Sequence, residues 1–267
     1  MTSSASPRDS RTSLARYRNA LWILTRRDLR VRYSTSVLGY LWSILDPLVM
    51  AGIYWFVFTV VLDRGDSIGA TPYIVFLLAG LLPWMWFNGA VSDSTRAFLK
   101  DAKLVRSTAL PRSVWVLRIV LSKGIEFLAS LPVLFAFALL YGAPLHWEAL
   151  YLPLAVALQA ILTTGVGLII APLVVFFRDL ERATKLLLRF LFYASPIVYG
   201  LANLPEQLQL AASFNPLAGI MTLYRAAFFP ELLDAPAVLI GAAVSFVILG
   251  IGVLVFRRSE RSVLKEL

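Results

Sequence analysis

Long runs of apolar residues dominate the chain, and six of them are long enough to cross a membrane as helices. A helix needs about 20 apolar residues to cross roughly 30 Å of hydrocarbon. The runs that meet this length are 37–62, 72–92, 113–141, 149–177, 184–202 and 236–256. The fifth is the weakest, because it is short and contains Arg189. The pattern predicts an all-α integral membrane protein with six transmembrane helices.

The apolar runs also divide the chain into three parts. Residues 37–256 form the predicted transmembrane domain, residues 1–36 a polar N-terminal segment, and residues 257–267 a short basic tail. Between the fifth and sixth spans, Asn215 and Pro216 separate two apolar pieces that are each too short to cross. These pieces are predicted to be two short re-entrant helices that dip into the outer leaflet and return.

The N-terminal segment has a helical pattern of its own. Leu14, Tyr17, Leu21 and Leu24 recur at helical spacing with arginines distributed around them. This pattern predicts an amphipathic helix that lies on the inner membrane surface, held by its apolar stripe and by anionic lipids. A solvated basic tail is the alternative. The segment lacks an apolar run before its first charges and is not typical of a cleavable signal peptide.

The distribution of basic residues predicts the orientation. Segments 1–36, 93–112, 178–189 and 257–267 hold 21 of the 25 Lys and Arg residues. Short basic loops stay on the cytoplasmic side, so both termini are predicted to be cytoplasmic in a multi-pass protein of the plasma (inner) membrane. The net charge of +9 comes from these inner segments, which argues against nucleic-acid binding.

Composition and motifs argue against a catalytic chain. The chain is 59% hydrophobic, contains no cysteine and has His146 as its single histidine. It also lacks the Gly-rich phosphate-binding motif of nucleotide hydrolases. Asp46 and Glu126 are the two acidic residues inside the predicted spans, and they lie on different helices. We therefore expect no enzyme activity, metal site or cofactor in this chain.

The few charges inside the predicted spans need an explanation, because each is costly in hydrocarbon. Lys123 and Glu126 are three residues apart on one helix and are expected to pair. Arg118 is close enough to the inner end of its span to snorkel to the interface. Asp46 precedes Pro47, which kinks a helix, and two possibilities stay open for it: an ordinary structural role or a position facing a cavity.

Aromatic residues make up 13% of the chain. Most tryptophans fall near the ends of spans, as an interfacial belt requires. Some aromatic residues instead lie beside helix-breaking prolines, where a passage could open and aromatic faces could stack on sugar rings. The residues considered for such a passage, together with Asp46, are Tyr33, Tyr40, Trp42, Trp84, Trp86, Tyr193 and Tyr199.

Several segments resemble one family of transport proteins. The segment RDLRVRYSTSVLGYLWSILDPL at 27–48 is similar to the entrance of the first span in permease subunits of ABC exporters for lipid-linked polysaccharides, such as O-antigen, teichoic acid and galactan. LLAGLLPWMWF, FFRDL, SPIVYG, FNPL and LYRAAFF resemble later parts of the same family in the same order. The resemblance covers about residues 15–256.

This resemblance implies an ATP-driven polysaccharide exporter. The chain would form a homodimer, and two copies of a separate ATPase subunit would bind ATP and Mg²⁺. The N-terminal helix would act as a gate, with Arg26, Arg27, Arg30 and Arg32 on it. A drug or small-lipid exporter of the same fold, or a membrane enzyme of cell-envelope synthesis, are the alternatives.

The charged segment FLKDAKLVRSTALPRSVWVL at 98–117 is the expected contact with the ATPase. It predicts a short helix that begins after Ser92 or Ser94 and stops before Pro111, with apolar and charged faces exposed to the cytoplasm. The residues expected to couple to the ATPase are Phe98, Lys100, Asp101, Lys103, Leu104 and Arg106. Relatives often have a different sequence here, so a different partner surface is expected.

Overall fold

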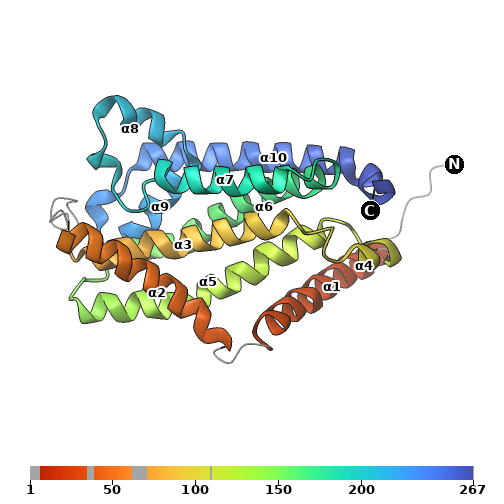
Figure 1. The fold of residues 1–267 in the computed structure, drawn as a ribbon, viewed down its shortest axis with the longest axis horizontal. Helices are drawn as coiled ribbons and strands as arrows, with labels where there is room; N and C mark the ends of the chain where they lie inside the picture. The colour runs from red at the N-terminus through yellow and green to blue at the C-terminus, as the bar shows by residue number, and fades with distance from the viewer. Residues whose placement is uncertain (1–6, 35–38, 62–70, 109, 267) are drawn as a thin grey trace.

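The computed structural model describes residues 7–34, 39–61, 71–108 and 110–266, and every regular element in these ranges is helical. The longer helices run side by side along one axis (Figure 1). The short helix α8 (Glu206–Ser213) lies at one end, whereas α4 (Ala102–Ser107) and the C-terminal end of α10 (Ala235–Glu266) lie at the other (Figure 1). The predicted class, an all-α membrane protein, agrees with this arrangement.

Four helical segments in the described ranges are long and apolar enough to cross a membrane. They are α3 (Tyr73–Ser94), α5 (Val114–Leu140), η4 (Trp147–Tyr151) continued by α6 (Leu152–Phe176), and α10. The first three match predicted spans closely. The fourth continues well beyond residue 256, so most of the predicted tail is helical.

Helices α6 and α10 pack most closely where glycines remove the side chains between them. A Cβ atom added to Gly252 would lie only 2.4 Å from the carbonyl oxygen of Gly165. Any larger residue at Gly252 would therefore push the two backbones apart. Small residues favour helix association in membranes for this reason, because apolar burial alone gives no preference over lipid.

The predicted first span is helical but not uniform. Helix α2 (Trp42–Trp55) contains Pro47 and continues into η2 (Phe56–Val61), a π-helical turn. Its apolar part, Leu45–Val61, is shorter than the four long segments. Residues 37 and 38, which begin the predicted span, lie outside the described ranges.

The predicted fifth span, 184–202, is wrong at its C-terminal end. Helix α7 (Leu180–Ala194) has 15 residues, which corresponds to about 22 Å and is shorter than the hydrocarbon core. It ends where Ser195 adopts an extended conformation before Pro196, as the steric effect of proline on the preceding residue requires. A separate 3₁₀ turn, η5 (Leu201–Asn203), follows. The count of six crossings therefore stays a prediction.

Two short helices lie between α7 and α10, as predicted, and Asn215 separates them. Helix α8 ends at Ser213, and α9 (Pro216–Ala226) begins with a proline after Asn215, whose side chain accepts a hydrogen bond from the Leu217 amide. The turn η6 (Pro230–Leu232) leads into α10. Arg225 of α9 is buried and donates hydrogen bonds to the carbonyls of Pro196, Ile197 and Tyr199. That these helices are re-entrant stays a prediction.

The predicted amphipathic segment is a single helix, α1 (Pro7–Ser34), and it packs against α5. Leu24 is buried, Tyr17 and Leu21 are partly buried against the core, and the hydroxyl groups of Tyr17 and Ser113 are 3.2 Å apart. The side chain of Leu14 is outside the described part. The apolar stripe of α1 therefore contacts protein, while Trp22 and Ile23 remain exposed.

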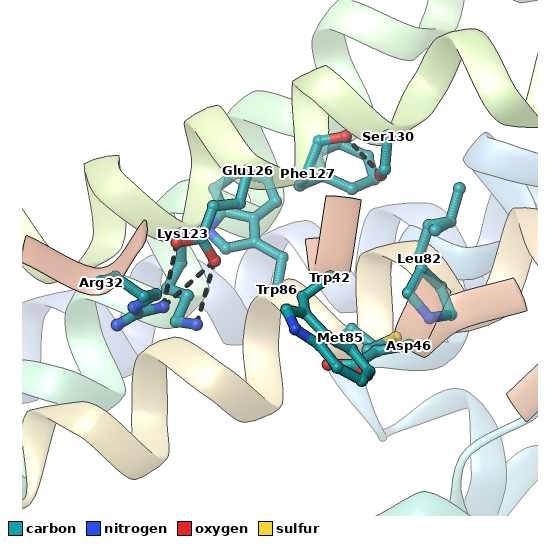
Figure 2. A pocket seen from close by; sticks show the side chains of 11 residues that line it. Arg32, Trp42, Asp46, Leu82, Met85, Trp86, Lys123, Glu126, Phe127 and Ser130 are labelled. Atoms are coloured by element: carbon teal, nitrogen blue, oxygen red, sulfur yellow. Dashed lines mark hydrogen bonds and ion pairs between the residues drawn. The ribbon is translucent and has the colours of Figure 1, made fainter. Parts of the chain in front are cut away.

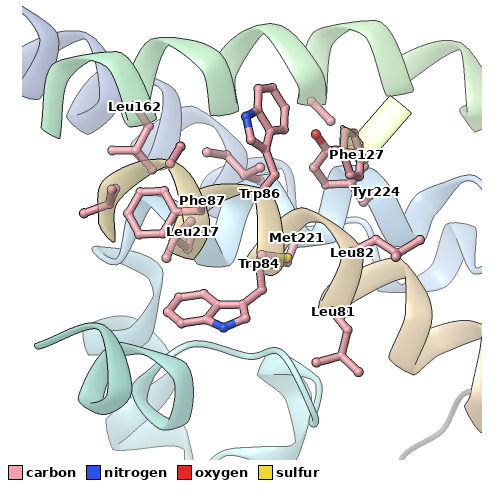
Figure 3. Close-up of a cluster of buried hydrophobic side chains, with 14 of the residues drawn as sticks. Leu81, Leu82, Trp84, Trp86, Phe87, Phe127, Leu162, Leu217, Met221 and Tyr224 are labelled. Carbon is pink, nitrogen blue, oxygen red and sulfur yellow. The ribbon is translucent and has the colours of Figure 1, made fainter. Parts of the chain in front are cut away.

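Helix α3 lies at the centre of the molecule, with α2, α5, α6, α7 and α9 packed around it. Figure 3 shows Trp84 and Trp86 leaving α3 in different directions. The ring of Trp86 stacks on Phe127 with centroids 5.2 Å apart, and its indole nitrogen donates to the Val120 carbonyl. Trp84 meets Phe192 of α7 edge to face. Both tryptophans therefore fix α3 against its neighbours.

Candidate functional site

The segment expected to contact the ATPase lies beside α1 (Figure 1). The predicted start of this helix is wrong, because residues 95–101 form turns and α4 begins only at Ala102, whereas the helix ends at Ser107 and so stops before Pro111 as predicted. The physical reason is the burial of Phe98, which is 2% exposed and packs its ring against Phe256 of α10. Phe98 is therefore not exposed to a cytoplasmic partner in this structure.

The exposed part of this segment is mostly cationic. Lys100, Lys103 and Arg106 are exposed, Leu104 is partly buried, and Leu99 is an exposed apolar side chain. Val105 is fully buried and packs α4 against the other helices. A partner would therefore meet a basic surface with Leu99 at its edge.

Asp101 differs from its neighbours, because it faces inward and joins three helical elements. Its carboxylate accepts hydrogen bonds from Arg118 of α5 at 2.5 Å and from Arg27 of α1 at 2.9 Å. Arg118 also donates to Asp28 of α1 at 3.0 Å. Burial alone would raise the pKa of Asp101, but the guanidinium groups of Arg118 and Arg27 more than offset it, so its pKa lies below the usual 3.8.

Arg118 is the centre of this first cluster. Its side chain is 2% exposed and lies over the ring of Trp115, 4.8 Å from the centroid. The expectation that it snorkels to the interface is therefore wrong. Two carboxylates, Asp28 and Asp101, supply the counter-charge inside the protein, so the side chain has no need to reach water.

A second cluster holds the C-terminal part of α1. Arg32 binds Asp93 of α3 at 2.7 Å and both carboxylate oxygens of Glu126 of α5 at 3.0 and 3.1 Å. The ammonium group of Lys123 lies 3.0 Å from Glu126, so the predicted pairing of these two residues is confirmed. Figure 2 shows Arg32, Lys123 and Glu126 grouped together.

The four arginines assigned to the gate helix therefore fall into two pairs. Arg27 and Arg32 bind carboxylates of other elements, whereas Arg26 and Arg30 are exposed and form no ion pair with any of the described residues. The cavity between the two clusters has a volume of about 860 Å³ and is lined by residues of α1, α3, the turns after α3, α5 and the start of α7. Helix α1 thus covers a polar cavity and is anchored on both sides of it.

A third group of charges joins the turns after α3 to the start of α7, two segments that the predicted topology places on the cytoplasmic side. Glu181, at the start of α7, pairs with Arg96 after α3 and with Lys185 one turn along α7. These hydrogen bonds lower the pKa of Glu181 to about 2. The beginning of α7 is therefore connected to the segment that precedes α4.

Three of the predicted passage residues line one pocket of about 350 Å³ between α1, α2, α3 and α5. They are Trp42, Asp46 and Trp86, and Arg32, Lys123 and Glu126 line the same pocket. In Figure 2, Trp42 and Asp46 lie apart from the charged group. Asp46 therefore faces a cavity, one of the two possibilities that its position next to Pro47 left open.

The remaining candidates do not join this pocket. Trp84 and Tyr193 line a different groove, and the hydroxyl of Tyr199 donates to the carbonyl of Tyr193. The side chains of Tyr33 and Tyr40 lie outside the described part of the structure. The predicted aromatic residues are thus divided between separate cavities of one chain.

Comparison with known proteins assigns the family. A family model described as ABC-2 type transporter matches residues 19–229. The chain belongs to this transporter family. It is 36% identical over 239 residues to the O-antigen export system permease protein RfbA of Klebsiella pneumoniae, covering 89% of this chain and 91% of that protein. It is 33% identical to the protein of the same name from Myxococcus xanthus, covering 92% of this chain and 95% of that protein.

A more distant relative is named for the transport of a different polysaccharide. The chain is 27% identical over 246 residues to the polysialic acid transport protein KpsM of Escherichia coli, covering 89% of this chain and 92% of that protein. The ABC-2 transporter match begins inside α1 and ends after α9, so it includes both ion-pair clusters. The clusters therefore lie within the part of the chain that the family model matches.

Sequence reasoning missed several residues of these clusters. Asp28, Asp93 and Glu181 were not among the predicted site residues, yet each binds an arginine of another element. One signal was present in the sequence: Arg118 lies in an apolar run without an acidic residue one helical turn away. A buried cation without a local partner requires a partner from elsewhere in the fold.

Proposed function

We propose that this chain is the transmembrane subunit of an ATP-driven exporter that moves a lipid-linked polysaccharide out of the cytoplasm. Two copies form the passage, and two copies of a separate ATPase subunit bind and hydrolyse ATP with Mg²⁺. The single observation that carries the proposal is the similarity to O-antigen export permeases over 89% of the chain. The membrane-spanning helices and the cationic segment beside α1 are consistent with this role.

The topology of the proposal has six crossings and cytoplasmic termini. In addition to the four long segments, α2 with η2 and α7 with the residues after it would complete the crossings. Helix α7 is too short to cross alone, and the ordered loop from Ser195 to Gly200, held by Arg225, extends it toward the outer side. Helices α8 and α9 would then remain in the outer leaflet.

The ion pairs connect the segment that would bind the ATPase to α1 and α5, so they would transmit movement of the ATPase to these helices. The ATPase would bind the exposed cations Lys100, Lys103 and Arg106. Asp101 lies in the same segment but binds Arg27 of α1 and Arg118 of α5. A displacement of this segment would therefore pull on α1 and α5 together, and α1 would move relative to the cavity that it covers.

Transport is tested most directly in the source bacterium. Deletion of the coding sequence should remove the surface polysaccharide and leave the lipid-linked polymer inside the cell, as detected by extraction and gel analysis of both fractions. A plasmid copy should restore export only when the ATPase partner has an intact nucleotide site. Surface polysaccharide at the normal level in the deletion strain would contradict the proposal.

A further inference from the structure

A groove of about 470 Å³ lies between α2, α3 and α7 and is separate from the cavities beside α1. Its volume falls within the range of roughly 300–1,000 Å³ that is usual for ligand sites. One face of α3 forms its floor, at positions 81, 84, 85, 88 and 92. This spacing follows a single helical stripe, so the groove runs along the helix axis over about 16 Å.

The groove changes character along its length. At the end formed by the C-terminal part of α7, the ring of Phe192 lies 5.5 Å from Tyr54 and 5.6 Å from Trp84. Toward the other end the lining becomes polar, with Asn88 and Ser92 from α3 and with Lys185 and Arg189 from α7. A ligand lying along the groove would meet aromatic faces at one end and hydrogen-bonding groups at the other.

Asn88 is the most informative of these residues. It is partly buried, and within the described ranges its side-chain amide has no hydrogen-bond partner. It lies six residues from the end of α3, or about 9 Å along the helix. An amide at this depth is costly in hydrocarbon unless water or a polar ligand satisfies it. The sequence therefore has an amide at a position where a lipid-filled groove would favour an apolar side chain.

Arg189 of α7 is a second polar residue of this groove without a partner for its side chain in the described part of the chain. It lines the groove and is exposed, and no carboxylate of the described residues pairs with it. Lys185, one turn earlier on α7, is paired with Glu181 at 2.7 Å. Two groups that together can donate and accept hydrogen bonds, Asn88 and Arg189, are thus open to one groove.

We propose that this groove binds the sugar rings of the transported chain and that Asn88 is a specificity-determining residue within it. This inference rests on the proposed function. The amide of Asn88 would exchange hydrogen bonds with ring hydroxyls, Arg189 would donate to a second set of oxygens, and Trp84 and Tyr193 would contact the apolar ring faces. Sugar rings carry both kinds of surface, whereas an acyl chain would leave both polar groups unsatisfied.

The first test measures whether the groove is open to water. The chain has no cysteine, so each introduced thiol is unique. Full-length Asn88→Cys in inverted membrane vesicles should react with a charged methanethiosulfonate reagent at least tenfold faster than Leu121→Cys. Leu121 is a matched control, because it is 42% exposed and lies at a similar depth on α5. Equal rates at the two positions, with Ser107→Cys reacting normally, would overturn the inference.

The second test identifies the occupant. In vesicles from cells that make the polysaccharide, reaction of Asn88→Cys should be slower than in vesicles from cells that cannot make it. Equal and fast reaction in the two kinds of vesicle would show that the groove holds water alone. If the thiol is unreactive in both kinds of vesicle, the groove is filled by lipid or by a second copy of the chain. Either result would contradict a sugar site.

The third test addresses specificity. Asn88→Leu preserves the side-chain size and should lower export about fivefold at equal membrane abundance, as expected for one lost hydrogen bond. Asn88→Gln should restore part of the export, and Leu121→Ala should leave it unchanged. Normal export by Asn88→Leu would refute the role of Asn88 without affecting the proposed function. The proposed function itself fails only if deletion of the chain leaves export intact.

Discussion

Replacement of Arg118 by leucine should release α1 from the transmembrane helices. Arg118 is almost completely buried and binds Asp28 of α1 and Asp101 of the segment before α4. Arg118→Leu leaves both carboxylates facing an apolar side chain. Arg27 would remain as their partner, at 2.9 Å from Asp101 and 3.5 Å from Asp28. The variant thus removes the buried arginine of the cluster, Arg118, and keeps the more exposed one, Arg27.

The free-energy cost of Arg118→Leu follows from the burial of the ion pairs that it breaks. Loss of one partner from a buried ion pair costs about 3–5 kcal/mol, because the remaining charge is left uncompensated. Here the carboxylates keep 16–17% of their surface and retain Arg27, so the lower end of this range, about 3 kcal/mol, applies. A change of that size raises the population of detached α1 by roughly a hundredfold.

A cysteine reporter can measure this detachment. Thr25 is fully buried on α1, and cysteine is close to it in size. The labelling rate of Thr25→Cys by a water-soluble thiol reagent should increase about a hundredfold in the Arg118→Leu background. Arg26→Gln is the control, because Arg26 is exposed on the same helix and its loss should change the rate little. An increase of less than threefold in Arg118→Leu would refute the argument that this cluster anchors α1.

Three further predictions follow from the same elements. Single cysteines at Ser67 and Ser107 should be labelled by an impermeant maleimide on opposite sides of the membrane, and labelling of both in intact cells would contradict the six-span topology. Leu99→Asp should reduce co-purification of the ATPase severalfold without loss of membrane insertion, whereas an equivalent change at the exposed Leu254 of α10 should not. The pKa values of Asp101 and Glu181 are both lowered in the folded state, so each carboxylate contributes stability that is complete above its usual pKa and is lost as the pH falls through its folded pKa, which is about 2 for Glu181. Thermal unfolding at a series of acidic pH values should therefore show a smaller acid loss in Asp101→Asn than in the unmodified chain.

The sequence predicted the helices that are long and apolar with good accuracy, and it was less successful where proline intervenes. The boundaries of α3, α5 and α6 follow from hydrophobic length alone. Helix α7 ends at Ala194 because of Pro196, although apolar residues continue beyond it. Hydropathy detects what can lie in lipid, but it does not detect where the backbone leaves the helix.

Charged residues show a different limit. Lys123 and Glu126 were correctly paired because both partners lie on one helix face. The partners of Arg118 come from α1 and from the turn before α4, which are 90 and 17 residues away in sequence. A single sequence indicates that such a charge must be compensated, but packing decides which of several nearby acids compensates it. The same holds for Asp101, which the sequence analysis assigned to the contact with the ATPase.

The inward orientation of Asp101 changes what the neighbouring cations can do. If Asp101 faced the ATPase, as the sequence suggested, binding of the partner would be separate from the position of α1. Its bonds to Arg27 and Arg118 instead make one rigid connection from the exposed surface to two helices. The segment can then move only if α1 and α5 follow or if these ion pairs break. Since a broken pair of this kind is costly, joint movement is the lower-energy response to a displaced docking segment.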